Sequence, residues 1–325
     1  MKSTLQNRIA IFALTLALAG AYGVPSLHAD NTPYRMESLP SNDVFSDFVV
    51  GPGKVELTLK PGESKTINVS VSNRLGEERT FDIVTEDIKG SEDPEQTVVL
   101  MGNERGPYSL KDFFEYSAAS FVLPHAKKAI VPITIHAPEK AEPGGYYGSV
   151  LFKTAPNKTG ADGAVAGAAI VSRIGILFFV TVPGSNDYKG NLESFITKAG
   201  SIFTKGPVVF QLRFRNSGNI HLDPSGEISI KNMIGTEVDR VPVETWFALP
   251  QSLRSREVVW DRGYLMGRYT ATAKIDRGYD DQKDTMSLTF WVIPWQPIAI
   301  VLGIILVLFF IIRFFASHFE VQRKR

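Results

Sequence analysis

The sequence predicts an all-β chain in which two β-sandwiches in tandem precede one C-terminal transmembrane helix. Apolar and polar residues alternate with period two through most of the 325 residues, with Pro and Gly between the runs. Short strands at such spacing are typical of sandwiches. A Pro- and Gly-containing break at 183–187 divides the pattern in two, and a long apolar run lies close to the C-terminus.

The N-terminal residues 1–29 are expected to be a secretory signal peptide. Lys2 and Arg8 precede a short apolar run, and Ala29 supplies a small residue at the presumed cut. Cleavage after Ala29 is expected; cleavage elsewhere and an uncleaved anchor are the alternatives. Residues 30–43 are interpreted as an N-terminal linker.

The first sandwich is expected over 44–183. Its predicted strands cover 55–59, 67–72, 80–86, 120–123, 129–137, 146–153 and 169–182. The small residues 159–167 are interpreted as a hairpin tip, because the strand–glycine–helix context of a ligand-binding glycine loop is missing. The apolar run 169–182 predicts a strand that is buried on both faces or has a bulge at Gly175.

Residues 109–119 interrupt the period-two pattern. The spacing of Leu110, Phe113 and Phe114 predicts one or two helical turns, with Ser109 as part of a cap.

The second sandwich is expected over 188–291, close to the membrane. Residues 293–316 are apolar enough and long enough to cross a bilayer, and 317–325 form a basic tail. The positive charges in this tail favour a single-pass topology with the sandwiches extracytoplasmic and the tail cytoplasmic. The alternative is a buried core helix.

Composition sets limits on the partners. The formal net charge is +1, so there is no electrostatic case for binding nucleic acid. The chain has no cysteine, so no disulfide holds the exported domains together. A cysteine-free exported chain favours a bacterial envelope.

The sequence shows no constellation of catalytic residues, so an enzyme is not expected, and neither are a metal site or a cofactor. The histidines are not in metal-ligand spacing. His221, beside a turn, is interpreted as filling a satisfied polar position. The acidic clusters at 86–87, 91–95 and 276–284 are interpreted as solvated loops.

Three segments of the first domain carry a resemblance. They are Leu59–Glu63 (LKPGE), the strand Ile67–Asn73 (INVSVSN) and Pro143–Val150 (PGGYYGSV). Together with the layout of signal, two β-domains, span and tail, this region resembles the first domain of the WxL-interacting protein family. That resemblance implies an immunoglobulin-like, peptidoglycan-binding domain. The second domain resembles immunoglobulin-like modules generally, through Phe214–Asn219.

Three residues are candidates for interaction. Tyr146 and Tyr147 point to opposite faces of one predicted strand, so one is expected in the core and the other is available to a sugar ring or a protein surface. Arg173 interrupts an apolar run. It is interpreted as a strand-edge residue facing water, as a binder of an anionic group, or as half of an internal salt bridge.

These observations predict a membrane-anchored bacterial cell-surface binding or scaffold protein that bridges the membrane to peptidoglycan or another surface protein. The lipid bilayer is contacted through one transmembrane helix. The alternative is an exported, chaperone-like assembly factor for surface proteins, which an edge-exposed strand at 169–182 would favour. An envelope enzyme is a third, weaker hypothesis.

Overall fold

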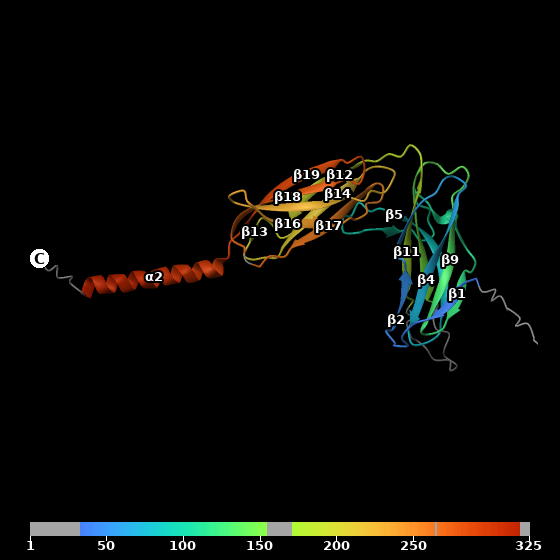
Figure 1. Ribbon diagram of the computed structural model, residues 1–325, viewed down its shortest axis with the longest axis horizontal. Coiled ribbons are helices and arrows are strands. Elements are labelled where there is room, and N and C mark those ends of the chain that lie inside the picture. The colour runs from blue at the N-terminus through green and yellow to red at the C-terminus, as the bar shows by residue number, and fades with distance from the viewer. Residues whose placement is uncertain (1–32, 155–170, 264, 319–325) are drawn as a thin grey trace, which may run out of the picture.

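The computed structural model describes residues 33–154, 171–263 and 265–318, which form two β-sandwiches and one C-terminal helix (Figure 1). The prediction of an all-β chain with two immunoglobulin-like sandwiches is confirmed. The expected signal peptide, the hairpin tip at 159–167 and residues 319–325 of the tail lie outside the described residues.

The first sandwich, domain 1, packs a five-stranded sheet against a six-stranded one. The first sheet has the order β1 (Arg35–Ser38), β9 (Lys127–His136), β4 (Ser64–Arg74) and β2 (Asp47–Gly51), with β7 (Phe114–Tyr116) paired to β9. The second has the order β3 (Lys54–Thr58), β11 (Arg173–Val182), β10 (Gly144–Thr154), β5 (Arg79–Lys89) and β6 (Val99–Leu100), with β8 (Ser120–Leu123) paired to β5. Inward-facing side chains such as Phe81, Phe121 and Phe152 fill the space between the sheets.

The second sandwich, domain 2, has a three-stranded and a five-stranded sheet. The first has the order β12 (Gly190–Thr197), β14 (Val208–Asn216) and β17 (Ser252–Trp260). The second has the order β13 (Ile202–Phe203), β19 (Lys283–Val292), β18 (Gly267–Asp276), β15 (Ser225–Asn232) and β16 (Glu237–Val243). The core is centred on aromatic rings, with Trp260 and Tyr269 both packed on Phe290.

In each sandwich a buried asparagine side chain hydrogen-bonds to the backbone of one turn. The buried Asn73 amide donates to the carbonyls of Glu77 and Leu123, and the buried Asn216 amide donates to those of Ile220 and Ala248. Each asparagine oxygen also accepts a backbone N–H two residues further on. A strand-end asparagine thus satisfies the backbone groups that the turn would otherwise leave buried and unpaired.

The interpretation of 30–43 as a linker is wrong in part. Arg35–Ser38 forms the edge strand β1, which pairs antiparallel with β9 over Lys127–Ile130. Its four residues have no alternation of buried and exposed side chains. An edge strand whose side chains are mostly exposed leaves no hydrophobic pattern in the sequence.

The helical prediction for 109–119 holds only for a single 3-10 turn, Lys111–Phe113, and the chain then enters β7. Ser109 does not cap it. Instead, the carboxylate of Asp87 accepts the backbone N–H groups of Leu110 and Lys111 at 3.0 Å each. Asp87 is completely buried, so the interpretation of 86–87 as a solvated loop is wrong: backbone donors replace the water around this carboxylate.

β11 pairs without interruption with β10 from Arg173 to Val182, so there is no bulge at Gly175. A Cβ at Gly175 would lie 2.5 Å from the Leu151 side chain and 2.7 Å from Ser149 Oγ. The glycine is therefore explained by close side-chain approach from the neighbouring strand.

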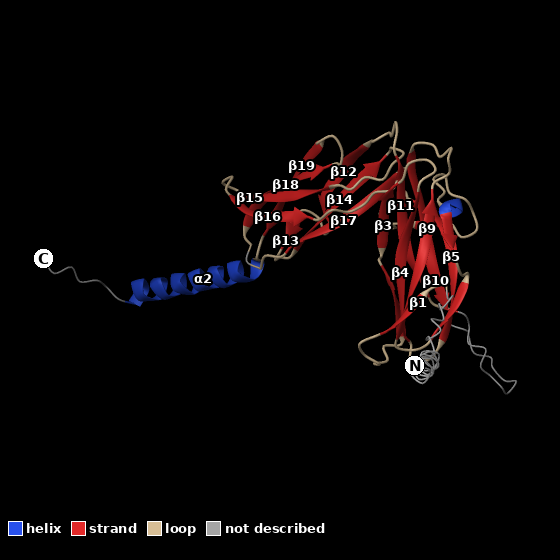
Figure 2. Ribbon diagram, turned by 45° about the vertical axis from the view of Figure 1, so that its right-hand side comes forward, coloured by secondary structure: helices blue, strands red, loops and turns tan. Residues whose placement is uncertain are grey.

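Helix α2 (Trp295–His318) begins only two residues after β19 ends. Its segment Trp295–Phe315, 21 residues, is long and apolar enough to cross a membrane, and no part of it is buried against the sandwiches. Its exposure excludes the alternative of a buried core helix. α2 continues outward from one end of domain 2, and domain 1 lies across the other end, so the molecule has an elbow (Figures 1 and 2).

Candidate functional site

The elbow is packed by a small hydrophobic cluster, here called the junction cluster. Its buried members are Ile88, Tyr147, Phe179 and Leu249, and Val98, Tyr108, Leu177 and Phe247 pack against them. The domain 1 members lie mainly on the outer face of the six-stranded sheet, and Phe247 and Leu249 precede β17 of domain 2. The part of this face around Tyr147 and Phe179 is therefore covered by the second domain rather than by solvent, which explains why β10 and β11 are apolar on both faces there.

Tyr147 links the two domains through its hydroxyl. The hydroxyl oxygen accepts the backbone N–H of His221 at 2.6 Å and lies 3.1 Å from Nδ1 of the same residue. The ring is 1% exposed and packs edge-on against Phe179. Burial raises the pKa of the Tyr147 hydroxyl far above its ordinary value, so the group stays neutral and bonded to His221.

Tyr146 faces the opposite way. Its ring packs against Phe113 at the margin of the domain 1 core, and its hydroxyl donates to the Glu142 carbonyl at 2.9 Å. The structure therefore places one of the two adjacent tyrosines against a core and the other against a protein surface, and that surface belongs to the same chain.

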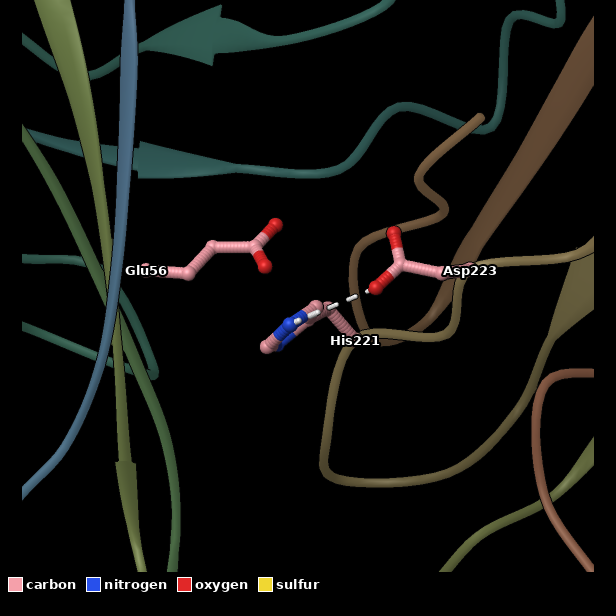
Figure 3. Close-up of side chains that lie close together, drawn as sticks. All are labelled: Glu56, His221 and Asp223. Carbon is pink, nitrogen blue, oxygen red and sulfur yellow. Dashed lines mark ion pairs between the residues drawn. The ribbon is translucent and has the colours of Figure 1, made fainter. Parts of the chain in front are cut away.

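Glu56, His221 and Asp223 come together (Figure 3), and His221 places this group beside Tyr147. Each offers one possible metal-ligating atom, and these atoms lie within 4.8 Å of one another. His221 Nε2 is 3.9 Å from Asp223 Oδ2. However, the Lys54 ammonium already forms an ion pair with Glu56. The arrangement is thus a charge network across the elbow in which lysine supplies the cation that a metal would otherwise provide.

The titration of this network follows from burial. Desolvation lowers the pKa of His221, against the attraction of Asp223, and desolvation raises the pKa of Asp223. Lys54 also lies 5.5 Å and 5.2 Å from the ring centres of Phe179 and Phe247, so its charge contacts both domains.

A loop of domain 1 binds the exposed edge of β17. The carbonyls of Ser91 and Pro94 accept the N–H groups of Leu253 and Ser255 at 2.9 and 3.1 Å. Arg215 adds an ion pair to Glu92 at 2.9 Å. The interpretation of 91–95 as a solvated loop holds for its acidic side chains, since Glu92, Asp93 and Glu95 are exposed. It fails for the backbone, which extends the three-stranded sheet of the other domain.

A second feature lies at the remote end of β11, near Arg173. The Thr154 N–H donates to the Ser172 carbonyl, so even-numbered residues of β11 bond to β10 and odd-numbered residues face the other side. That other side is paired with β3 only from Leu177 onward. No described strand pairs with it over Arg173–Ile176, which is here called the free edge.

The free edge exists because the first long strand of domain 1 changes sheets. β3 lies beside β11, but the residues before it, β2, pair with β4 in the opposite sheet, and the change occurs across Gly51–Gly53. The apolar side chain of Ile174 remains 36% exposed there.

Arg173 forms an ion pair with Glu86 at 3.4 Å while its own side chain is 56% exposed. It therefore has both the salt bridge and the water-facing position that the sequence left open as alternatives. Beside it, Ser149 has a buried hydroxyl with no partner among the described residues. Both line a groove of about 260 Å³ with Leu151 and Leu177.

The sequence identified Tyr147 and Arg173 and raised an exposed edge of the strand at 169–182 as one alternative, which the structure shows only over Arg173–Ile176. It missed Lys54 and Asp223. The alternation in β3 marks Lys54 and Glu56 as outward-facing, but nothing local shows that another domain covers that face.

No protein-family model matches the chain, and no curated protein matches it. The structure is similar to that of the class 5 fimbriae chaperone CfaA, with 14% identity over 75% of this chain and 99% of that one and a TM-score of 0.36. It is also similar to the Pseudomonas aeruginosa CupB2 chaperone, with 11% identity over 74% of this chain and 100% of that one and a TM-score of 0.35. At these identities and scores the likeness concerns the fold alone.

Proposed function

We propose that the chain is a membrane-anchored assembly factor of the cell surface that binds an extended segment of another surface protein as an added β-strand. The observation that carries this proposal is the free edge of β11, where Arg173 and Gly175 direct backbone N–H and C=O groups to a side with which no described strand pairs. Unpaired strand edges are templates for pairing with another chain.

The side chains at this edge fit such a partner. Ile174 lies on the core-facing side of β11, in line with Ile176 and Phe178, yet it is partly exposed. A strand added beside the free edge would cover Ile174 and so extend the hydrophobic core of domain 1 to this side chain. Arg173 gives the edge a charge that limits indiscriminate pairing, a common feature of natural edge strands.

The anchor and the elbow give the edge a fixed place. The 21-residue, largely apolar segment of α2 holds domain 2 at the membrane, and the junction cluster fixes domain 1 across its far end. A captured segment is thereby held away from the bilayer. Anchoring with the sandwiches outside is part of the same proposal.

The test is photo-crosslinking in cells from a photoreactive residue at Ile174. The matched control is Val84, 37% exposed against 36% for Ile174, on β5, which has strands on both sides. We expect a surface protein to crosslink from Ile174 and not from Val84.

Two substitutions at one position separate the edge from its side chain. Arg173→Pro removes an edge N–H at the first residue of the strand, where proline is tolerated, and Arg173→Ala keeps that N–H while removing the ion pair. Loss of the crosslink in Arg173→Pro but not in Arg173→Ala supports strand addition. Equal crosslinking from Val84, or persistence in Arg173→Pro, would contradict it.

The bridging role implied by the family resemblance stays a prediction. It uses the same anchor but needs peptidoglycan binding, which retention of the chain on purified sacculi measures. Retention that is unaffected by Arg173→Pro would favour the bridge over strand capture.

A further inference from the structure

The end of domain 2 beside α2 carries exposed apolar side chains on several loops. Ile234 is 80% exposed, Met266 is 72% exposed, and Ile202 and Met233 are exposed to similar extents. These four residues are here called the rim.

The rim residues lie together because of strand register. Gly267 pairs with Val292 at the end of β19, and Asn232, which leads into Met233, pairs with Tyr269. A Cβ at Gly267 would lie 3.7 Å from the sulfur of Met233. Ile202 pairs with Trp291. Separate loops thus meet at the last two residues of β19.

The rim is also continuous with the start of α2. A cavity of about 490 Å³ between domain 2 and the helix is lined by Met266 and Leu265 on one side and by Pro294 and Trp295 on the other. Lys205 lines the same cavity. At about 3.3–3.6 Å per extended residue, the two residues between β19 and α2 span only about 7 Å.

The opposite end of domain 2 has a different character. The turn between β18 and β19 carries Asp280 and Asp281, and the turn after β14 contains Ser217 and Asn219. A group of exposed aliphatic and methionine side chains at one end of a sandwich calls for an apolar partner at that end.

We propose that the rim inserts into the interfacial layer of the bilayer that α2 crosses, so that domain 2 stands on the membrane instead of swinging from its anchor. The proposal rests on the membrane anchoring proposed above. The partner is the boundary between headgroups and acyl chains, which amphipathic surfaces enter to a depth of about 5–10 Å. The short connection brings the rim to that depth.

The side chains suit this layer. Tryptophan is enriched at membrane interfaces, and Trp295 is exposed between the rim and the helix. Lys205 extends from the same cavity and can place its ammonium among lipid phosphates while its methylenes stay with the apolar residues.

The test uses the full chain, which has no cysteine of its own. Ile234→Cys and Met266→Cys are each labelled with a nitroxide and placed in phospholipid nanodiscs that hold one chain. Asp281→Cys marks the remote end of domain 2, and Ile304→Cys marks the middle of α2. Collisions with oxygen, which concentrates in lipid, are compared with collisions with a water-soluble nickel chelate.

The measured quantity is the ratio of the oxygen collision rate to the nickel collision rate. We expect this ratio to be several-fold higher for labels at Ile234 and Met266 than for the label at Asp281, and to approach the ratio at Ile304. If they match Asp281 while Ile304 reports lipid, the rim proposal fails and anchoring stands. If Ile304 itself is open to the nickel chelate, anchoring fails as well. The labels at Ile234 and Met266 could instead be shielded from both reagents, and only in discs that hold two chains. That result would assign the rim to contact with a second copy and overturn the lipid contact.

Discussion

The Tyr147 hydroxyl should contribute measurably to the stability of the elbow. In the unaltered chain the His221 backbone N–H donates to the Tyr147 hydroxyl at 2.6 Å. The Tyr147→Phe substitution keeps the ring packing but leaves this N–H without an acceptor and removes the hydroxyl's contact with His221 Nδ1. An unsatisfied buried donor costs about 1–3 kcal/mol. We therefore expect the free energy of unfolding to fall by about that amount.

The neighbouring tyrosine is a matched control. Tyr146→Phe removes a hydroxyl that donates to the Glu142 carbonyl at an exposed position, so its cost should stay within about 0.5 kcal/mol. The assay is urea unfolding of the full chain in detergent, followed by tryptophan fluorescence. All four tryptophans lie at or after Trp246, so the signal reports domain 2.

Tyr147 belongs to domain 1, so a shift in this signal measures coupling between the domains. Equal effects of Tyr147→Phe and Tyr146→Phe would refute the reasoning, because they would show that the hydroxyl contributes nothing across the elbow.

Three further outcomes follow from the same structure. Between pH 7.5 and 5.5 the chain should lose stability, and His221→Gln should lose less. Burial lowers the pKa of His221 below its ordinary 6.5, so the unfolded chain binds a proton at this residue before the folded chain does as the pH falls, and the folded state loses stability. The pKa of Asp223 is raised, so its protonation favours the folded state at lower pH. The midpoints of urea unfolding at each pH measure the sum of the two effects. Gly218→Ala should lower the free energy of unfolding by about 1–3 kcal/mol, because the new Cβ would lie 2.2 Å from a backbone oxygen. The control is Gly53→Ala, whose Cβ would have nothing within 4 Å, so its loss should be smaller. Thermal unfolding of the two variants compares them. Zinc should raise the unfolding midpoint of Lys54→Met more than that of the unaltered chain, because the substitution frees the Glu56 carboxylate.

The long strands could be predicted because one face of each is buried. Val55 and Leu57 alternate with exposed residues in β3, and the same alternation appears in β9 and β18. β1 could not be predicted, because its four residues bury no regular set of side chains.

The candidate site was less predictable, because its parts are far apart in sequence. Tyr147 and His221 are separated by 74 residues, and each is locally compatible with a strand or a turn in isolation. His221 was predicted as a satisfied polar residue, and its bond to Tyr147 confirms this. The interpretation of 86–87 as a solvated loop failed for a similar reason: the groups that bind the Asp87 carboxylate are backbone N–H groups of Gly106 and Leu110, which lie in a loop distant in sequence. The turn at 276–284 agrees with the prediction at Asp280 and Asp281, which are exposed.

Under the proposed function, the placement of the free edge accounts for a rigid elbow. Arg173 lies nine residues before Val182, so at about 3.3 Å per residue the edge is about 30 Å along β11 from the connection to domain 2. A flexible hinge would let that arm sweep a wide volume, and each captured segment would lose its orientation. The junction instead combines a buried cluster, backbone pairing at Ser91 and Pro94, and a charge network around Lys54. Together these contacts restrict the movement of domain 1 against domain 2, which is what the capture of a strand at a fixed orientation would require.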